Sequence, residues 1–139
     1  MNWKRIWTGA LCAGLVFFGL DFLINHVILI SAWRAYGLAG HLKPFGPHIV
    51  PVLILKDLLV GFMLMWLYAL ARPRLGPGPK TAFRMGLVAW ALLYVPMSIN
   101  QWLFDPMPSI IPATYFIAGL VQCWIAIYVA GWQYIERAP

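Results

Sequence analysis

The chain has 139 residues, of which 63% are hydrophobic and only 10% are charged. A soluble domain is nearer half apolar and one quarter charged, so this composition excludes an ordinary soluble protein and indicates an integral membrane protein. The net charge of +6 does not indicate nucleic-acid binding, because most of the ten Lys and Arg residues flank apolar runs, where cationic residues orient membrane spans. The length predicts a single integral membrane domain over residues 1–139.

The apolar runs predict four membrane-spanning helices, since a span needs about 20 mostly apolar residues. The first run follows Lys4 and Arg5, as in a signal peptide, but it continues well past a signal-peptide core, so we expect an uncleaved helix. Prolines and glycines separate the later runs, and Thr81 is expected to cap the third. The predicted spans cover about residues 6–30, 49–71, 81–104 and 110–134.

The connector over residues 31–48 is apolar and aromatic for a loop. We expect it to lie along the outer membrane surface as a plain connector, and a short amphipathic helix is the alternative.

The basic residues predict the orientation of these spans. With the N-terminus in the cytoplasm, only Arg34 and Lys43 of the flanking basic residues lie outside, which satisfies the positive-inside rule. The predicted fold class is therefore an all-α, four-span transmembrane antiparallel helix bundle in a bacterial inner membrane, with both termini cytoplasmic.

Three charged residues interrupt the predicted spans. Asp21 lies in the first, and Lys56 and Asp57 lie in the second. A charge at the bilayer centre costs at least ~2.5–3.5 kcal/mol on insertion scales, so such residues face the bundle interior or a watery cavity and usually have a partner. They indicate either a functional site or an ion pair that fixes the helix register, and the sequence leaves both open.

Polar residues from all four spans are expected to converge in the outer half of the membrane. Asp21 and Asn25 lie four residues apart and share a helix face. Asp57 shares a face with Gly61, whereas Lys56 points about 100° away. These positions predict a binding pocket open to the outer side and lined by Asp21, Asn25, Lys56, Asp57, Asn100, Gln101 and Gln122.

Other candidate sites have less support. His26 and His48 could hold a metal or haem near the outer interface, but the His spacing fits no metal signature, and we predict no cofactor. Cys12 and Cys123 are expected to be small packing residues, because the chain has no CxxC motif. Trp90, Tyr94 and Trp124 are expected to pack in the core, with an aromatic cage for a cation as the alternative.

The sequence predicts a small polytopic inner-membrane protein that is a non-enzymatic accessory subunit or ligand-binding component rather than an enzyme. Its expected partners are the lipid bilayer and either a second copy of the chain or other membrane subunits. No nucleic-acid partner is expected. One alternative is an oligomeric proton- or cation-coupled transporter in which Asp21 or Asp57 is the coupling carboxylate. A haem- or metal-dependent membrane enzyme is a further alternative.

Four spans with an acidic residue in the first resemble the architecture of the small multidrug-resistance transporters. Those proteins are shorter, carry a Glu in the first span and lack a pair such as Lys56-Asp57 in the second. No catalytic residue or family is therefore assigned from the sequence.

Overall fold

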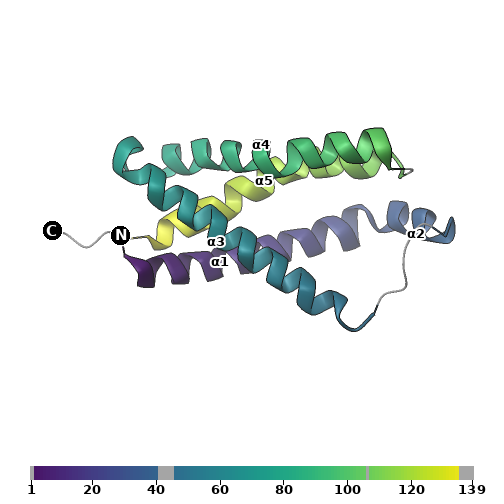
Figure 1. The fold of residues 1–139 in the computed structure, drawn as a ribbon, viewed down its shortest axis with the longest axis horizontal. Coiled ribbons are helices and arrows are strands. Elements are labelled where there is room, and N and C mark those ends of the chain that lie inside the picture. Colours follow the sequence, from purple (N-terminus) through teal and green to yellow (C-terminus); the bar gives the residue numbers. More distant parts are fainter. Residues whose placement is uncertain (1, 41–45, 106, 135–139) are drawn as a thin grey trace.

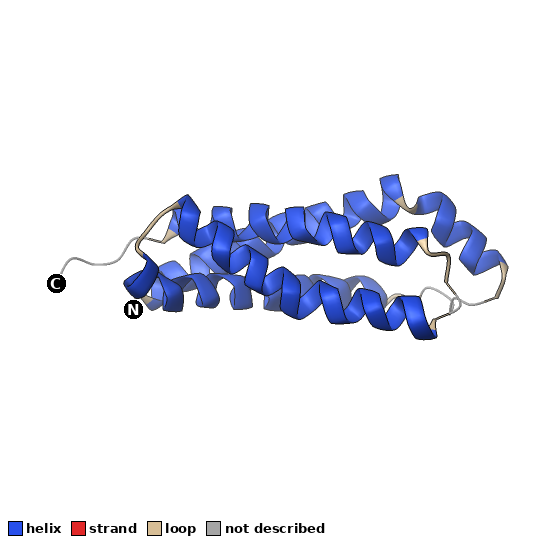
Figure 2. Cartoon of the chain, turned by 90° about the horizontal axis from the view of Figure 1, so that it is seen from above, coloured by secondary structure: helices blue, strands red, loops and turns tan. Residues whose placement is uncertain are grey.

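The structure is a computed structural model that describes residues 2–40, 46–105 and 107–134, and all regular structure in these residues is helical (Figures 1 and 2). A short π-helix, η1, directly continues the first α-helix. The elements are α1 (Trp3–Leu23), η1 (Ile24–Ile28), α2 (Ile30–Leu38), α3 (Ile49–Leu75), α4 (Pro79–Phe104) and α5 (Ile110–Gln133).

Four helical segments are long and apolar enough to cross a membrane. At most 39% of the most apolar window of any of them is buried inside the bundle, so large apolar side chains cover the outside. Apolar surface of this extent is typical of contact with lipid or with another protein. The four segments are Trp3–Ile28, Ile49–Leu75, Pro79–Phe104 and Ile110–Gln133.

The expected span boundaries agree with these helices to within a few residues, and the largest difference is at the end of α3. This helix continues past the predicted end at residue 71 and through Pro73 to Leu75. It ends at Gly76, whose φ of +81° suits glycine, and whose N–H donates a hydrogen bond to Arg72 O at 2.9 Å. The proline therefore lies in the last turn of the helix and does not end it.

The turn between α3 and α4 is held by side chains from both helices. Thr81 Oγ1 donates a hydrogen bond of 2.7 Å to Gly76 O, and Tyr68 OH accepts one of 3.1 Å from the Gly78 N–H. Thr81 was expected to cap the start of the third span, and this expectation is wrong. Because α4 already begins at Pro79, Thr81 lies inside its first turn and binds the end of α3 instead.

The expected outer connector contains a helix, α2, so the alternative of a short helix is confirmed for residues 30–38. Leu29, just before α2, and Ile24 of η1 form a small apolar cluster with Ile111 of α5. Residues 41–45 of the connector, which include His41 and Lys43, lie outside the described residues.

α1 and α3 approach each other closely at a pair of glycines. A methyl group added at Gly61 would lie 2.5 Å from Ala10 O and from Gly14 Cα, both of which are backbone atoms. A methyl group at Gly14 would lie 2.9 Å from Leu58 Cα. Small residues at such a crossing let two backbones approach closely in a membrane. The crossing places the next turn of α3, which carries Asp57, against α1.

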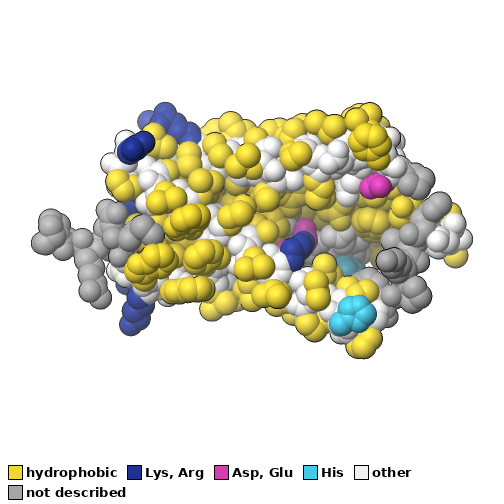
Figure 3. All heavy atoms as spheres, viewed as in Figure 1, with side chains coloured by type: hydrophobic (Ala, Val, Ile, Leu, Met, Phe, Trp, Pro, Cys, Tyr) yellow, Lys and Arg dark blue, Asp and Glu magenta, His cyan; other side chains and the backbone are white. Residues whose placement is uncertain are grey.

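Most basic side chains visible in Figure 3 lie at one end of the bundle, and one lies midway along it. In the chain, most basic residues lie in the first turn of α1, the last turn of α3 and the first two turns of α4. The main apolar core extends from this end toward the middle, through residues such as Ile6, Ala13, Leu64 and Ile127. Of the buried polar residues, Thr81 lies at the turn between α3 and α4, and Asp57, Ser98 and Gln122 lie farther along their helices from that turn or from the C-terminal end of α5.

Candidate functional site

The structure brings the three intramembrane charges into contact. Lys56 Nζ lies 2.6 Å from Asp21 Oδ2 and 2.9 Å from Asp57 Oδ1, so one ammonium bridges two carboxylates on α1 and α3. The side chains are exposed to very different extents, which are 48% for Lys56, 15% for Asp21 and 1% for Asp57. Asp57 is therefore an interior group, whereas Lys56 reaches the surface of the bundle.

Lys56 and Asp57 are neighbours in the chain and start on helix faces about 100° apart. The long, flexible lysine side chain overcomes this separation and returns its ammonium to the neighbouring carboxylate. The contact with Asp57 Oδ1 is an ion pair by distance, without the directed geometry of a hydrogen bond. The bond to Asp21 Oδ2 is both an ion pair and a hydrogen bond, so it defines the position of the ammonium.

Gln122 connects this ion cluster to the other two long helices. Its Nε2 donates hydrogen bonds of 3.1 Å to Asp21 Oδ1 and to Phe17 O, both on α1. Its Oε1 accepts a hydrogen bond of 2.8 Å from Tyr94 OH on α4. The ring of Tyr94 fits because Gly119 has no side chain, since a methyl group there would lie 2.5 Å from the ring. Polar side chains thus join α1, α3, α4 and α5 in one network.

Asn25 extends the network toward α2. Its Nδ2 donates a hydrogen bond of 2.8 Å to Asp21 O, and its Oδ1 accepts bonds from Trp33 Nε1 at 2.9 Å and from Tyr115 OH. Asn25 lies in η1, and single π-helical turns within α-helices are frequent at functional sites. The π-helix therefore carries a residue that holds both the α2 connector and α5.

We expect Gln122→Leu to lower the free energy of unfolding by about 1–3 kcal/mol, because it leaves Tyr94 OH and one oxygen of Asp21 without a partner inside the bundle. Tyr94→Phe should cost about 0.5–1.5 kcal/mol. A double-mutant cycle measured by reversible denaturation in detergent micelles should therefore show coupling between the two positions. Strict additivity of the two losses would mean that this hydrogen bond contributes nothing to stability.

Five of the seven predicted binding residues belong to this network, namely Asp21, Asn25, Lys56, Asp57 and Gln122. Asn100 and Gln101 do not take part in its hydrogen bonds. Asn100 is exposed on α4, and Gln101 is half-buried with its Oε1 enclosed and without a hydrogen bond.

Three aromatic residues of the network were not among the predicted binding residues. Tyr94 was expected to pack in the core, and the other two are Trp33 and Tyr115. A helix-face pattern pointed to one of them, because Tyr115, Gly119 and Gln122 share a face of α5. Trp90, part of the cage alternative, instead donates a hydrogen bond of 2.8 Å to Phe116 O.

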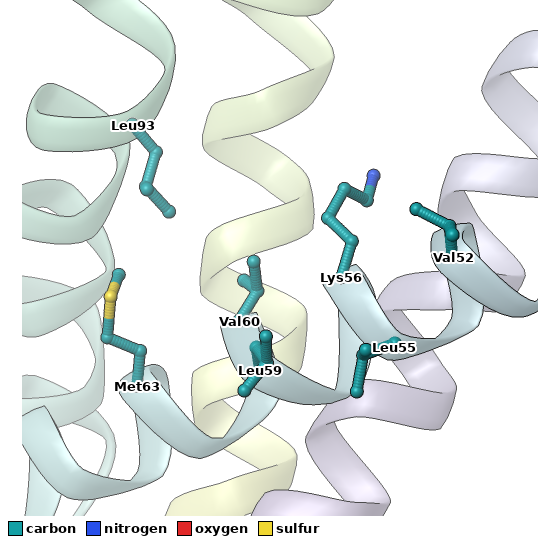
Figure 4. A pocket seen from close by; sticks show the side chains of 7 residues that line it. All are labelled: Val52, Leu55, Lys56, Leu59, Val60, Met63 and Leu93. Atoms are coloured by element: carbon teal, nitrogen blue, oxygen red, sulfur yellow. The ribbon is translucent and has the colours of Figure 1, made fainter.

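A groove opens on the side of the bundle beside Lys56. It has a volume of about 360 Å³ and lies between α3 and Leu93 of α4 (Figure 4). Figure 3 shows basic and acidic side chains in a hollow midway along this face, surrounded by apolar ones. The groove opens on the side of the bundle, so the predicted pocket open to the outer side stays a prediction. Its lining consists of Lys56 and the apolar residues Val52, Leu55, Leu59, Val60, Met63 and Leu93.

The candidate metal-binding histidines lie apart from the network. The ring of His26 is exposed and stacks on Phe22 at 4.3 Å between centroids, and His48 is exposed just before α3. Within residues 2–40, 46–105 and 107–134, no group of three or more His, Cys, Asp and Glu side chains could hold a metal ion.

The sequence matches no model of a known protein family, and it has no significant similarity to a curated protein or a solved structure.

Proposed function

We propose that the chain is a small multi-pass protein of a bacterial inner membrane that acts as a ligand-binding component, either as a homo-oligomer or beside other membrane subunits. Its four spans run antiparallel, with both termini in the cytoplasm. The basic end of the bundle supports this orientation, because Lys and Arg are enriched on the cytoplasmic side of membrane proteins. The proposal assigns no catalytic residue and no nucleic-acid partner.

A single observation carries the proposal, namely the half-exposed side chain of Lys56 at the edge of an apolar groove on the side of the bundle. Lys56 lies about 24 Å along α3 from Arg72, at about 1.5 Å of rise per residue, and thus well inside the apolar belt. A charge exposed to acyl chains at this depth is costly, so intramembrane charges usually mark a binding site or a solvated path. A ligand in the groove would cover the exposed stem of Lys56 and keep acyl chains away from its ion cluster.

A purely structural role for the ion cluster is the competing explanation, because buried polar pairs can simply fix helix register. The groove distinguishes the two roles, since a structural clamp requires no occupant. The test is native mass spectrometry of the full chain, extracted from its own membrane in a mild detergent. We expect a bound small molecule on the wild type and its loss in Val60→Phe, which fills the groove.

Val121→Phe provides the matched control, because Val121 is 48% exposed on α5 and does not line the groove. This variant should keep the bound molecule. The ligand-binding function is wrong if the wild type carries no such molecule, or if both variants retain it equally.

A proton- or cation-coupled transporter is the second candidate, and the charge balance of the cluster favours it. Two carboxylates share one ammonium, which leaves one surplus negative charge when all three groups are ionised. A coupling proton or cation could neutralise this surplus. Proteoliposomes with the wild type should then show a proton or cation flux that Asp21→Asn abolishes. A wild-type flux equal to that of empty liposomes would exclude the transporter.

A further inference from the structure

We infer that water binds inside the bundle along α4, held by Ser98 and Gln101, and connects the Tyr94–Gln122 hydrogen bond to the aqueous phase at the end opposite the basic residues. This inference goes beyond the proposed ligand-binding function, because it concerns the interior of the bundle and not the groove on its side. Its consequence is a hydrated path that reaches the polar network from one side of the membrane only.

Two enclosed side-chain oxygens on α4 carry the inference. Ser98 is 3% exposed, and its Oγ has no hydrogen bond to any residue that the structure describes. The same is true of the Oε1 of Gln101, about one turn farther along the helix. An oxygen in this position has lost its hydration without gaining a partner, which is costly. Ordered water is the usual partner of buried polar atoms that the protein itself leaves unpaired.

The hydroxyl of Ser98 is not satisfied within its own helix. A helical serine or threonine can donate to the carbonyl four residues earlier, and Thr8 does so, with its Oγ1 at 3.0 Å from Lys4 O. Ser98 makes no such bond to the carbonyl of Tyr94. Its hydroxyl is therefore left to bind a molecule between the helices, and water is the smallest that both donates and accepts.

Ser98 and Gln101 lie on the helix face that carries Tyr94. Spacings of four and three residues place the three side chains in one row on α4. Successive positions are about 6 Å and about 4.5 Å apart along the helix, and one water with two hydrogen bonds of about 2.8 Å spans such gaps. Because Tyr94 OH donates to Gln122, which in turn donates to Asp21, this row continues the network to the last turn of α4.

The opposite direction along the same face is dry. Between Tyr94 and the turn at the start of α4, the buried face carries Ala89, Gly86 and Ala82, none of which has a polar side chain. Ala82 and Ala89 belong to the main apolar core, together with Ile127 of α5. Apolar walls offer water no hydrogen bond. The water path therefore ends at the network and does not continue to the basic end of the bundle.

The test is X-ray radiolytic labelling of the full chain in phosphatidylcholine nanodiscs, in water enriched in heavy oxygen, with the labelled residues identified by peptide mass spectrometry. Hydroxyl radicals form at bound water and modify the nearest side chains. We expect several-fold more label on Tyr94, which is 7% exposed, than on Met65, which is 0% exposed in the apolar core. Met65 is a strict control, because its thioether is readily oxidised wherever water reaches it.

Two matched pairs of variants assign the water to these side chains. Ser98→Val should remove most of the label on Tyr94, whereas Ser98→Thr, which has the same shape but keeps the hydroxyl, should retain it. Gln101→Leu should also reduce the label, and Asn100→Leu, at the exposed neighbouring position, should leave it unchanged.

The inference is overturned if Tyr94 carries no more label than Met65 in the wild type, because the interior beside Ser98 would then be dry. Equal label on Tyr94 in Ser98→Val and Ser98→Thr would overturn it as well, since the hydroxyl would then hold no water. Neither result bears on the groove beside Lys56, whose occupant is tested separately by native mass spectrometry.

Discussion

Gly61→Ala is expected to lower the free energy of unfolding by at least about 3 kcal/mol, because the new methyl group would collide with the backbone of α1. The nearest atoms are backbone atoms of Gly14 and Ala10, and backbone cannot move aside as a side chain can. The two helices must separate, which also draws Asp57 away from Asp21. Reversible unfolding in mixed detergent micelles, followed by circular dichroism, measures the loss.

Gly19→Ala is the matched control on the partner helix, because a methyl group there meets no atom within 4 Å. Its effect should lie within about 0.5–1 kcal/mol and should favour the helix, since alanine replaces glycine in a helix interior. The close crossing of α1 and α3 would be contradicted if the two variants were equally stable.

Lys56→Met is expected to destabilise the bundle by about 3–5 kcal/mol, because it leaves two carboxylates side by side with no cation between them. The buried Asp57 contributes most of this loss, as its carboxylate has little access to water. Lys80→Met, at an exposed position in the first turn of α4, should change stability by no more than about 0.5 kcal/mol. The same denaturation measurement compares both variants.

A rescue experiment separates the loss of charge balance from the loss of the lysine side chain. The triple variant Asp21→Asn, Lys56→Met, Asp57→Asn has no charge in the cluster, and it should recover most of the stability lost in Lys56→Met. If the triple variant stays as unstable as the single one, the contacts of the lysine stem rather than the ion pairs stabilise this region.

The helical class and the positions of the long helices could be predicted from the sequence, because apolar length alone defines a span. The meeting of Asp21, Lys56 and Asp57 could also be anticipated, because isolated charges inside spans are too costly to lack partners. The direction in which the Lys56 side chain extends depended on tertiary contacts and could not be predicted. Lys56 and Asp57 lie on different faces of the helix, but the flexible lysine side chain lets the ammonium return to the Asp57 carboxylate.

The other members of the network could not be predicted, because membership also depends on how each helix is rotated about its own axis. The depth of a residue in the membrane does not define this rotation. Asn100 and Gln101 lie at a suitable depth on α4, but it is Tyr94, about two turns earlier, that donates to Gln122. Trp33 joins the network through α2, whose path follows a π-helical turn that no residue pattern marks. Polar type and depth alone therefore identified five members of the network, whereas Asn100 and Gln101 do not join its hydrogen bonds.

The turn at Gly76–Gly78 holds α3 and α4 together at one end only. α3 ends and α4 begins at this turn, where Thr81 and Tyr68 bind the backbone, and the two helices diverge toward their other ends (Figure 1). Lys56 is about 30 Å of helix away from Gly76, so a tilt of about 5° would change the helix separation there by about 2.6 Å. A small change in the angle at this turn thus produces a larger change in the distance between α3 and α4 near Lys56. We expect bilayer thickness, which alters helix tilt, to control how readily the two helices separate there.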